Sequence, residues 1–310
     1  MKIAFFGTPS HSAKLLKSLI DENFQIEFVV TNPDKPSGRG KNLHPTPVKE
    51  VAISNNIPVY QFPSIKTDEA ISQITAKPID IFFVFAYGSI IPPKIFNHPK
   101  SGTINLHGSL LPEFRGASPI QSAILAGKTI TGMTLQYIVE ELDAGDIIVQ
   151  TEIPIDEKDN FETLLEKMTI SGTEEILKLL KNYKGEKFSS TPQDSSKATI
   201  CRKIKPESRK LDFQENARDL FNKIRAYYPG NTCYAEFRGK RIKIISSRVE
   251  ELTIDGETGA ISFLDKKNWG VICGDRKILV LESLQPENKK VMSHLDFRNG
   301  MRLENGELFR

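Results

Sequence analysis

An amide, an imidazole and a carboxylate stand in order along one stretch of this chain. Asn105 and His107 lie two residues apart after a short apolar run, and Asp143 follows after a helical and a strand-like segment. Transfer of an acyl group to an amine needs donors for the oxyanion and a route for the protons. Asn105 can donate to that oxyanion, and His107 can donate to it or carry a proton. Asp143 can orient the imidazole or hold a water that relays protons.

Each of these three side chains also has a structural explanation. A histidine at the end of a strand is more often a hydrogen-bonding partner than a catalyst, and asparagine is a common turn former. Asp143 precedes Ala144-Gly145, so its carboxylate has a turn to cap. No activated serine or cysteine is evident, which favours direct transfer over a covalent intermediate. The pattern indicates chemistry at a carbonyl only if the fold brings the side chains together.

Strands and helices alternate through the part of the chain that must position these residues. Apolar runs predict the strands, and amphipathic or capped segments between them predict the helices. The predicted strands cover 2–6, 25–31, 58–61, 79–85, 103–106, 131–139 and 146–153, and the predicted helices cover 10–22, 47–55, 67–76, 92–96, 119–126 and 160–182. This alternation predicts an α/β fold with a doubly wound, mainly parallel, Rossmann-like sheet.

The ends of the predicted strands indicate where a ligand would bind. Doubly wound sheets bind ligands beyond the carboxyl ends of their strands. Gly7, the Ala86–Gly88 turn and His107 each follow a predicted strand, so we expect them at this edge. The first turn reads GTPSHS and lacks the three-glycine pattern of dinucleotide sites, so such a site is not expected.

The segment 32–47, NPDKPSGRGKNLHPTP, is too long and too rich in turn residues for an ordinary strand-to-helix connection. Long loops at the carboxyl ends of parallel strands often carry function. Arg39 stands between two glycines, so its side chain can approach a phosphate or a base closely. A solvated loop without a function is the alternative.

The composition of the chain changes after the long helix predicted at 160–182. A polar stretch rich in Ser, Pro and Lys follows, and we interpret it as a linker. After a helix at 217–226, short strands predict a small β-barrel or sandwich; they cover 232–237, 241–246, 259–264, 270–272 and 277–284. The predicted parts are an α/β domain over 1–186, a linker over 187–206 and a β domain over 207–310.

Charge is distributed unevenly along the chain. Residues 1–196 carry 19 Lys and Arg against 23 Asp and Glu, whereas residues 197–310 carry 23 against 16. A basic second part suggests a polyanionic partner, and the basic hairpin at 238–243 is suited to phosphates. A solvated surface with surplus lysine is the alternative explanation.

Composition and cysteine content restrict the class of protein. With 39% hydrophobic and 26% charged residues, the 310-residue chain is typical of a globular protein of about two domains. No apolar run approaches the ~18 residues of a membrane span, and the start of the chain predicts a strand rather than a signal peptide. Three widely spaced cysteines fit the reducing cytoplasm, and they match neither a disulfide framework nor a metal motif.

Two segments of the chain contain longer sequence motifs. Residues 105–119, NLHGSLLPEFRGASP, and residues 142–147, LDAGDI, resemble the two halves of the signature of the folate-dependent formyltransferases. The resemblance extends to FFGTP at 5–9, to PDKPSGRGK at 33–41 and to Lys49, which are similar to the members that act on tRNA. It covers essentially the whole chain and weakens towards the C-terminus. The family often has a tyrosine where this chain has Phe114.

The resemblance implies an activity and a set of functional residues. It implies formyl transfer from 10-formyltetrahydrofolate to the α-amine of methionine on initiator methionyl-tRNA, by a monomer without a metal. Asn105, His107 and Asp143 would form the catalytic set. The folate would contact Ser109, Leu110, Leu111 and Pro112, and backbone groups of Ala86, Tyr87 and Gly88 would read its pterin. The C-terminal domain would be OB-like, and the candidates for tRNA contacts are Arg39, Lys41, Lys203, Lys205, Arg238, Lys240 and Arg241.

Two other functions are compatible with the sequence. Formyltransferases of amino sugars and hydrolases that release formate carry similar Asn, His and Asp sets with a different acceptor. A non-catalytic RNA-binding protein could keep the same fold, but Asn105, His107 and Asp143 are all intact. The loop 32–47 and the basic residues after 197 favour a tRNA acceptor.

Overall fold

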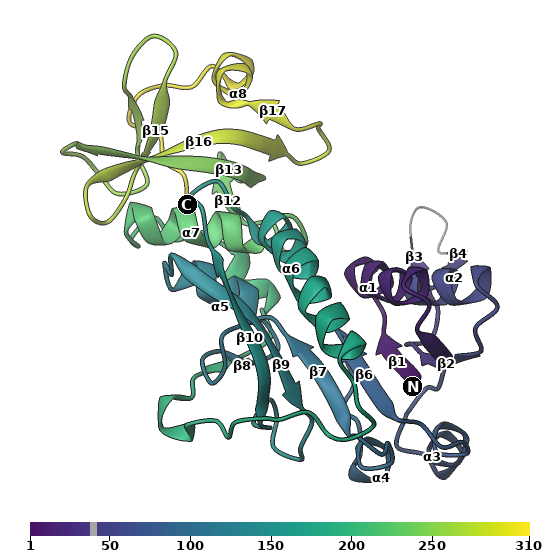
Figure 1. The fold of residues 1–310 in the computed structure, drawn as a ribbon. Coiled ribbons are helices and arrows are strands. Elements are labelled where there is room, and N and C mark those ends of the chain that lie inside the picture. Colours follow the sequence, from purple (N-terminus) through teal and green to yellow (C-terminus); the bar gives the residue numbers. More distant parts are fainter. Residues whose placement is uncertain (38–41) are drawn as a thin grey trace. The chain divides into compact units, whose positions relative to one another are not determined.

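The structure is a computed structural model that describes residues 1–37 and 42–310, so the predicted tRNA contacts Arg39 and Lys41 lie outside the described residues. The chain falls into two compact units, which we describe separately (Figure 1). Unit 1 comprises Met1–Pro119, Thr131–Pro154 and Glu166–Ile200, and unit 2 comprises Ile120–Ile130, Ile155–Leu165 and Cys201–Arg310. The domain limits drawn from the sequence stay predictions.

Unit 1 is built on a seven-stranded sheet with the order β10-β9-β7-β6-β1-β2-β5 (Figure 1). Its strands are β1 (Lys2–Gly7), β2 (Gln25–Val30), β5 (Val59–Tyr60), β6 (Ile81–Phe85), β7 (Thr103–His107), β9 (Ile130–Tyr137) and β10 (Ile147–Pro154). Neighbouring strands from β5 to β7 are parallel, and β9 runs antiparallel to β7. The prediction of a doubly wound, mainly parallel sheet is confirmed.

The central strands form the core of unit 1. All five residues of β6, IFFVF, are buried, as are the last five of β1. A strand covered on both faces has an apolar side chain at every position instead of an alternating pattern. Rings from the two strands pack on one another: Phe5 stacks on Phe83 with centroids 6.1 Å apart, and Phe6 meets Phe82 at 5.1 Å. This packing holds the ends of β1 and β6 in place.

The helices between residues 1 and 200 lie close to their predicted positions. They are α1 (Ser10–Asp21), α2 (Pro47–Ser54), α3 (Asp68–Ile74), α4 (Pro93–Phe96), α5 (Pro119–Leu125) and α6 (Phe161–Lys181). Thr46 caps α2 by accepting from the backbone N of Lys49 at 3.2 Å. Gly172 lets α6 approach β7, because a Cβ there would lie 3.1 Å from Cδ2 of Leu106.

A short hairpin lies inside the turn-rich segment that follows β2. Its strands are β3 (Lys35–Ser37) and β4 (Asn42–His44), which pair antiparallel. Lys49 Nζ lies 2.6 Å from Asp34 Oδ2 and donates to Gln61 Oε1 at 2.9 Å. The hydrogen bonds from Lys49 and Gln61 lower the pKa of Asp34. These contacts hold the base of the segment that carries Arg39.

The imidazole of His11 makes the stability of unit 1 sensitive to acid. Its ring packs edge-on against Phe85 with centroids 5.1 Å apart, and burial, helped by the charge of Lys14, lowers its pKa from 6.5 to about 4. In the unfolded chain His11 therefore takes up a proton near pH 6.5, whereas in the folded chain it does so only near pH 4. The free energy of unfolding falls as the pH drops from 6.5 towards 4.

We expect a His11→Phe variant to lose this acid sensitivity. The free energy of unfolding, measured in urea, should fall by up to about 2 kcal/mol more for the wild type than for the variant between pH 7.5 and pH 5. An identical pH dependence for both proteins would show that His11 is protonated freely in the folded state.

Unit 2 contains a six-stranded antiparallel sheet with the order β12-β13-β16-β15-β14, and β17 pairs with β16. The strands are β12 (Tyr234–Phe237), β13 (Lys240–Thr253), β14 (Ile261–Phe263), β15 (Trp269–Ile272), β16 (Lys277–Pro286) and β17 (Met292–Ser293). The helices are α7 (Ala217–Tyr227) and α8 (His294–Met301), of which the sequence predicted the first.

The last residues of the chain close this sheet into a barrel. The backbones of Arg310 and Glu236 exchange two hydrogen bonds, of 2.6 and 2.8 Å, beside β12. On the other edge of the sheet, Phe309 N donates to Gly259 O at 2.9 Å. The Phe309 ring turns inwards and stacks on Phe237 with centroids 4.7 Å apart. The prediction of a small β-barrel is confirmed, and the C-terminal segment is the part that closes it.

Candidate active site

The strand order of unit 1 reverses at β1, because the chain continues to β2 and β5 on one side and then to β6 and β7 on the other (Figure 1). Doubly wound sheets bind ligands at the carboxyl ends beside such a reversal. Thr8 follows β1, and its Oγ1 donates to the carbonyl of Tyr87, after β6, at 3.3 Å. Asn32 follows β2 and donates from Nδ2 to the same carbonyl at 2.8 Å. The predicted Ala86–Gly88 turn is therefore held at this edge.

The side chain of Tyr87 belongs to the core rather than to the surface of this turn. Its ring meets Phe6 edge-on with centroids 5.7 Å apart, and burial raises the pKa of its phenol to about 12. Ala86 and Gly88, on either side, both have positive φ angles, of 50° and 83°. A turn of this kind presents backbone groups, and their contact with a ligand stays a prediction.

The structure brings the three predicted catalytic residues together around the end of β7. His107 is the last residue of β7, and its Nδ1 lies 3.6 Å from Oδ2 of Asp143. Asn105 lies two positions earlier, so its side chain is on the same face of the strand. Gln136 of β9 is directly opposite Asn105 in the register, and its Nε2 donates to Asp143 Oδ1 at 3.1 Å.

The carboxylate of Asp143 is fixed by donors on both of its oxygens. Besides the amide of Gln136 on Oδ1, the backbone N of Gly116 donates to Oδ2 at 2.9 Å. The exposed fractions of the side chains are 12% for Asp143 and 6% for His107. In such poorly solvated surroundings, a carboxylate with a fixed orientation can orient an imidazole and stabilise its protonated form.

The other ring nitrogen of His107 faces a backbone carbonyl. Nε2 lies 3.0 Å from the carbonyl oxygen of Phe114. A ring protonated at Nε2 donates to this oxygen and leaves Nδ1 able to take up a proton. Phe114 has a φ of 57°, and its N donates to Thr199 Oγ1 at 2.8 Å, which holds that carbonyl in place. The contact uses only the backbone of Phe114, so the missing phenol leaves it intact.

The predicted folate-lining segment 109–112 is tied to β9 and β10. Ser109 is fully buried, and its Oγ donates to Glu113 O at 2.6 Å. Thr134 Oγ1 donates to the carbonyl of Ser109 and accepts from the N of Leu111, and Gln150 donates to the carbonyl of Leu111. Ser109 and Leu111 thus build the loop, whereas Leu110 and Pro112 keep part of their surface exposed. Their contact with a folate stays a prediction.

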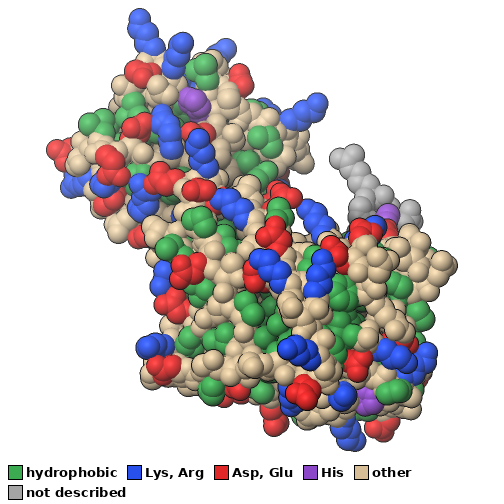
Figure 2. Space-filling view, in the orientation of Figure 1, with side chains coloured by type: hydrophobic (Ala, Val, Ile, Leu, Met, Phe, Trp, Pro, Cys, Tyr) green, Lys and Arg blue, Asp and Glu red, His purple; other side chains and the backbone are tan. Residues whose placement is uncertain are grey.

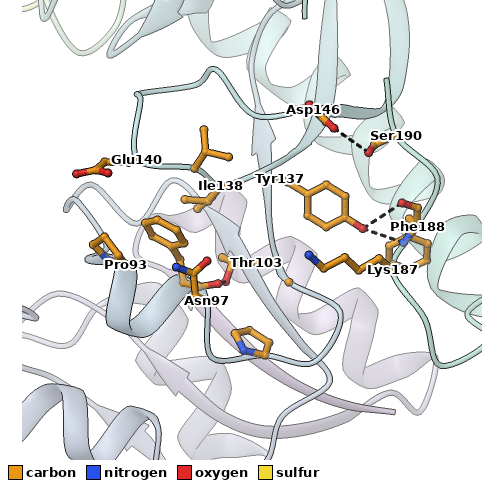
Figure 3. Close-up of a pocket in the computed structure, with 14 residues that line it drawn as sticks. Pro93, Asn97, Thr103, Tyr137, Ile138, Glu140, Asp146, Lys187, Phe188 and Ser190 are labelled. Atoms are coloured by element: carbon orange, nitrogen blue, oxygen red, sulfur yellow. Dashed lines mark hydrogen bonds between the residues drawn. The ribbon is translucent and has the colours of Figure 1, made fainter. Parts of the chain in front are cut away.

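A cavity of about 720 Å³ lies beside the loop that carries Asp143 (Figure 3). Its apolar wall includes Phe96, Ile138 and Val139, and Lys187 and Asp146 add charges to another part of its lining. None of the three predicted catalytic residues lines this cavity. The loop between β9 and β10 contributes to both places, because it supplies Val139 to the cavity and Asp143 to the cluster at β7.

Sequence reasoning missed these cavity residues and the side chains that support Asp143. The apolar pair Ile138-Val139 continues the pattern of β9, so it was assigned to the strand. Gln136 is 1% exposed although it looks like the outward residue of an alternating strand. A polar residue that is buried inside a strand is a signal of a polar network, but its partners are distant in the sequence.

The predicted tRNA contacts of unit 2 fall into two groups. Lys240 and Arg241 are exposed at the start of β13, and the guanidinium of Arg241 lies over the ring of Tyr234 at 4.1 Å. Lys203 and Lys205 are also exposed. Arg238 differs, because it binds Glu307 at 2.6 Å and the carbonyl of Met301 at 2.9 Å. Figure 2 shows Lys and Arg side chains interspersed with acidic ones on this unit.

The described residues, 1–37 and 42–310, contain neither a cluster of metal ligands nor a membrane-spanning helix. Within these ranges, no three side chains of His, Cys, Asp and Glu gather as the ligands of a metal would. In the same part of the chain, no helix combines the length and apolar character of a membrane span. Cys201, Cys233 and Cys273 are buried as free thiols, and burial raises the pKa of Cys233 and of Cys273 to about 12.

These features describe an α/β domain with an imidazole and a carboxylate close together at the end of a central strand. Residues 1–180 match the family model described as formyl transferase, and residues 203–302 match the model described as formyl transferase, C-terminal domain. The methionyl-tRNA formyltransferase of Leptospira interrogans is 48% identical over 100% of both chains. That of Sulfurihydrogenibium sp. is 40% identical, again over 100% of both. The chain belongs to the methionyl-tRNA formyltransferase family and is a transferase.

A solved structure supports the fold. The crystal structure of WlaRD, a sugar 3N-formyl transferase in the presence of dTDP and 5-N-formyl-THF, is similar with a TM-score of 0.69. The two chains are 21% identical, and the match covers 94% of this chain and 99% of the other. At this level of identity the similarity concerns the fold alone.

Proposed function

We propose that this protein transfers a formyl group from 10-formyltetrahydrofolate to the α-amine of methionine on initiator tRNA, in the cytoplasm. The observation that carries the proposal is the approach of Asp143 to His107 at 3.6 Å beside Asn105, at the end of β7. Full-length relatives named methionyl-tRNA formyltransferase support the choice of acceptor. The monomeric state is part of the proposal.

The chain's own residues have separate tasks in this reaction. The neutral amine attacks the formyl carbon, a C–N bond forms, and the bond from that carbon to the donor nitrogen breaks. The oxyanion that develops in between needs a donor in a fixed place, which the Asn105 amide supplies. One proton leaves the amine and one reaches the departing nitrogen, and His107 carries protons while Asp143 stabilises its charged form.

The region around the Asp143 loop suits a folate. A cavity of about 720 Å³ is within the size range of small-molecule sites. The flat pterin needs an apolar wall and backbone donors and acceptors. Phe96, Ile138 and Val139 offer the wall, and the Ala86–Gly88 turn offers the backbone groups. We propose that the donor binds between these elements, with its formyl group near His107.

A comparison of acceptors tests the proposed function. Purified protein is given 10-formyltetrahydrofolate together with charged initiator tRNA, charged elongator tRNA, free methionine or a dTDP-linked amino sugar. The proposal requires fast formylation of the charged initiator tRNA. A rate with tRNA no higher than that with free methionine contradicts the choice of acceptor, and faster transfer to the amino sugar would indicate a sugar formyltransferase.

The family resemblance implies that Arg39 approaches the acceptor stem, so we expect a selective effect of this residue on tRNA. Replacing Arg39 with alanine removes one phosphate or base contact, so the KM for charged tRNA should rise or turnover should fall, while the KM for folate stays constant. Lys2→Ala is a matched control, because Lys2 is an exposed basic residue at the amino end of β1. A weaker folate site in Arg39→Ala would show that the loop serves the other substrate.

A further inference from the structure

The amide of Gln193 holds the turn that carries Asp143. Its Nε2 donates to the backbone carbonyl of Asp143 at 2.9 Å and to that of Gly145 at 2.7 Å. The same nitrogen lies 3.2 Å from Oε1 of Gln136, whose own amide donates to the Asp143 carboxylate. Gln193 thus controls the backbone of Asp143, and Gln136 controls its carboxylate.

Arg115 fixes the orientation of Gln193. Its Nε and Nη2 both donate to Oε1 of Gln193, at 3.1 and 2.9 Å, so the amide nitrogen must point towards the Asp143 turn. Arg115 is 2% exposed and belongs to β8 (Arg115–Gly116), and its N donates to Thr199 O at 2.8 Å. Its Nη1 reaches the exposed Glu141 at 3.0 Å.

Gln193 comes from the polar stretch that we interpreted as a linker. This stretch is hydrogen-bonded to unit 1 at several points before unit 1 ends within β11 (Ile200–Cys201). The backbones of Thr191 and Ile147 exchange hydrogen bonds of 2.8 Å, and Phe188 N donates to the Tyr137 hydroxyl at 2.8 Å. These contacts fix the backbone on one side of Gln193.

The turn needs such support, because its conformation is strained. Asp143 has a φ of 52°, in the left-handed region that few residues other than glycine adopt without cost. Gly145 packs so tightly on β9 that a Cβ there would lie 1.8 Å from Tyr137 O. Released from Gln193, the turn can relax, and the Asp143 carboxylate would then move away from His107.

We propose that Gln193, oriented by Arg115, is a positioning residue that holds Asp143 against His107 during formyl transfer. The inference rests on the proposed function, in which Asp143 stabilises the charged form of His107. Gln193 touches neither substrate in this scheme. It acts through Asp143, and a displacement of about 1 Å in such a group commonly lowers turnover by about 100-fold.

The test is a double-mutant cycle in the full-length protein with charged initiator tRNA and 10-formyltetrahydrofolate. Gln193→Glu keeps the acceptor for Arg115 and the size of the side chain but loses the donation to both carbonyls. We expect kcat to fall by about 10- to 100-fold, with the KM of both substrates unchanged. In an Asp143→Asn background, measured in single turnovers, the same substitution should have no further effect.

The controls separate positioning from general stability. Glu141→Gln removes a charged partner of Arg115 but keeps the backbone carbonyl of Glu141 that accepts from Ala144 N at 3.3 Å, so it should retain full activity. Equal losses from Gln193→Glu in the wild-type and Asp143→Asn backgrounds would overturn the inference, as would a fully active Gln193→Glu protein. If Gln193→Glu does not fold, Gln193→Ala in both backgrounds gives the same test. A fully active Asp143→Asn protein would instead overturn the catalytic assignment.

Discussion

Replacing His107 with alanine is expected to lower kcat for formyl transfer by at least ~100-fold, while binding of tRNA changes little. In the proposed mechanism the imidazole carries protons during the transfer, and its Nδ1 lies 3.6 Å from Oδ2 of Asp143. Removing the ring therefore removes the proposed proton carrier. Steady-state kinetics with charged initiator tRNA and a filter-binding assay of tRNA affinity measure the two effects.

His98→Ala is a matched control for this variant. His98 is a second histidine of unit 1, and its Nε2 lies 2.9 Å from the carbonyl of Lys77, away from the three predicted catalytic residues. The His98→Ala protein should retain normal turnover. An active His107→Ala protein would exclude the imidazole from the mechanism, and a loss of tRNA binding would place His107 on the acceptor site.

Replacing Phe309 with alanine is expected to destabilise unit 2 by about 3–5 kcal/mol. The ring is 2% exposed and stacks on Phe237 at 4.7 Å and on Trp269 at 6.1 Å, so the substitution leaves a cavity in the centre of the barrel. The backbone hydrogen bonds of the closing segment lose their anchor at the same time. Urea unfolding, followed by the fluorescence of Trp269, measures the loss.

The matched control for Phe309 is an exposed apolar residue of the same unit. Val291 is 53% exposed, and Val291→Ala should change the free energy of unfolding by less than ~0.5 kcal/mol. A Phe309→Ala protein as stable as this control would show that the rest of the sheet holds the barrel without the C-terminal ring.

Much of the fold could be predicted because its strands and helices are long and periodic. The continuous apolar run of β6 predicted a strand covered on both faces, and it is buried throughout. Apolar periodicity carries no direction, so it could not show that β9 runs antiparallel to β7. The helix α8 was missed because its eight residues, HLDFRNGM, bury only Phe297 and include a glycine.

The candidate site could be predicted only in part. Asn105, His107 and Asp143 belong to contiguous motifs, and the structure places His107 3.6 Å from Asp143, with Asn105 opposite Gln136 on the same strand as His107. Their catalytic role stays a prediction. Gln193 and Arg115 could not be paired from the sequence, because 78 positions separate them and only the path of the backbone brings them together. A polar stretch without periodicity predicts a linker, and side-chain hydrogen bonds to a distant turn leave no periodic pattern.

The closing segment of the barrel also has a consequence for the folding kinetics of unit 2. Arg238 and Glu307, which bind each other beside it, are 69 positions apart in the sequence. Contacts of such separation form slowly, because a long loop must close before any contact energy is gained. We therefore expect the backbone groups of Glu236 and Gly259 that pair with Arg310 and Phe309 to stay unpaired in the partly folded chain until this segment docks. The amide hydrogens of Arg310 and Phe309 report this step, since their exchange with solvent measures how often the finished barrel reopens.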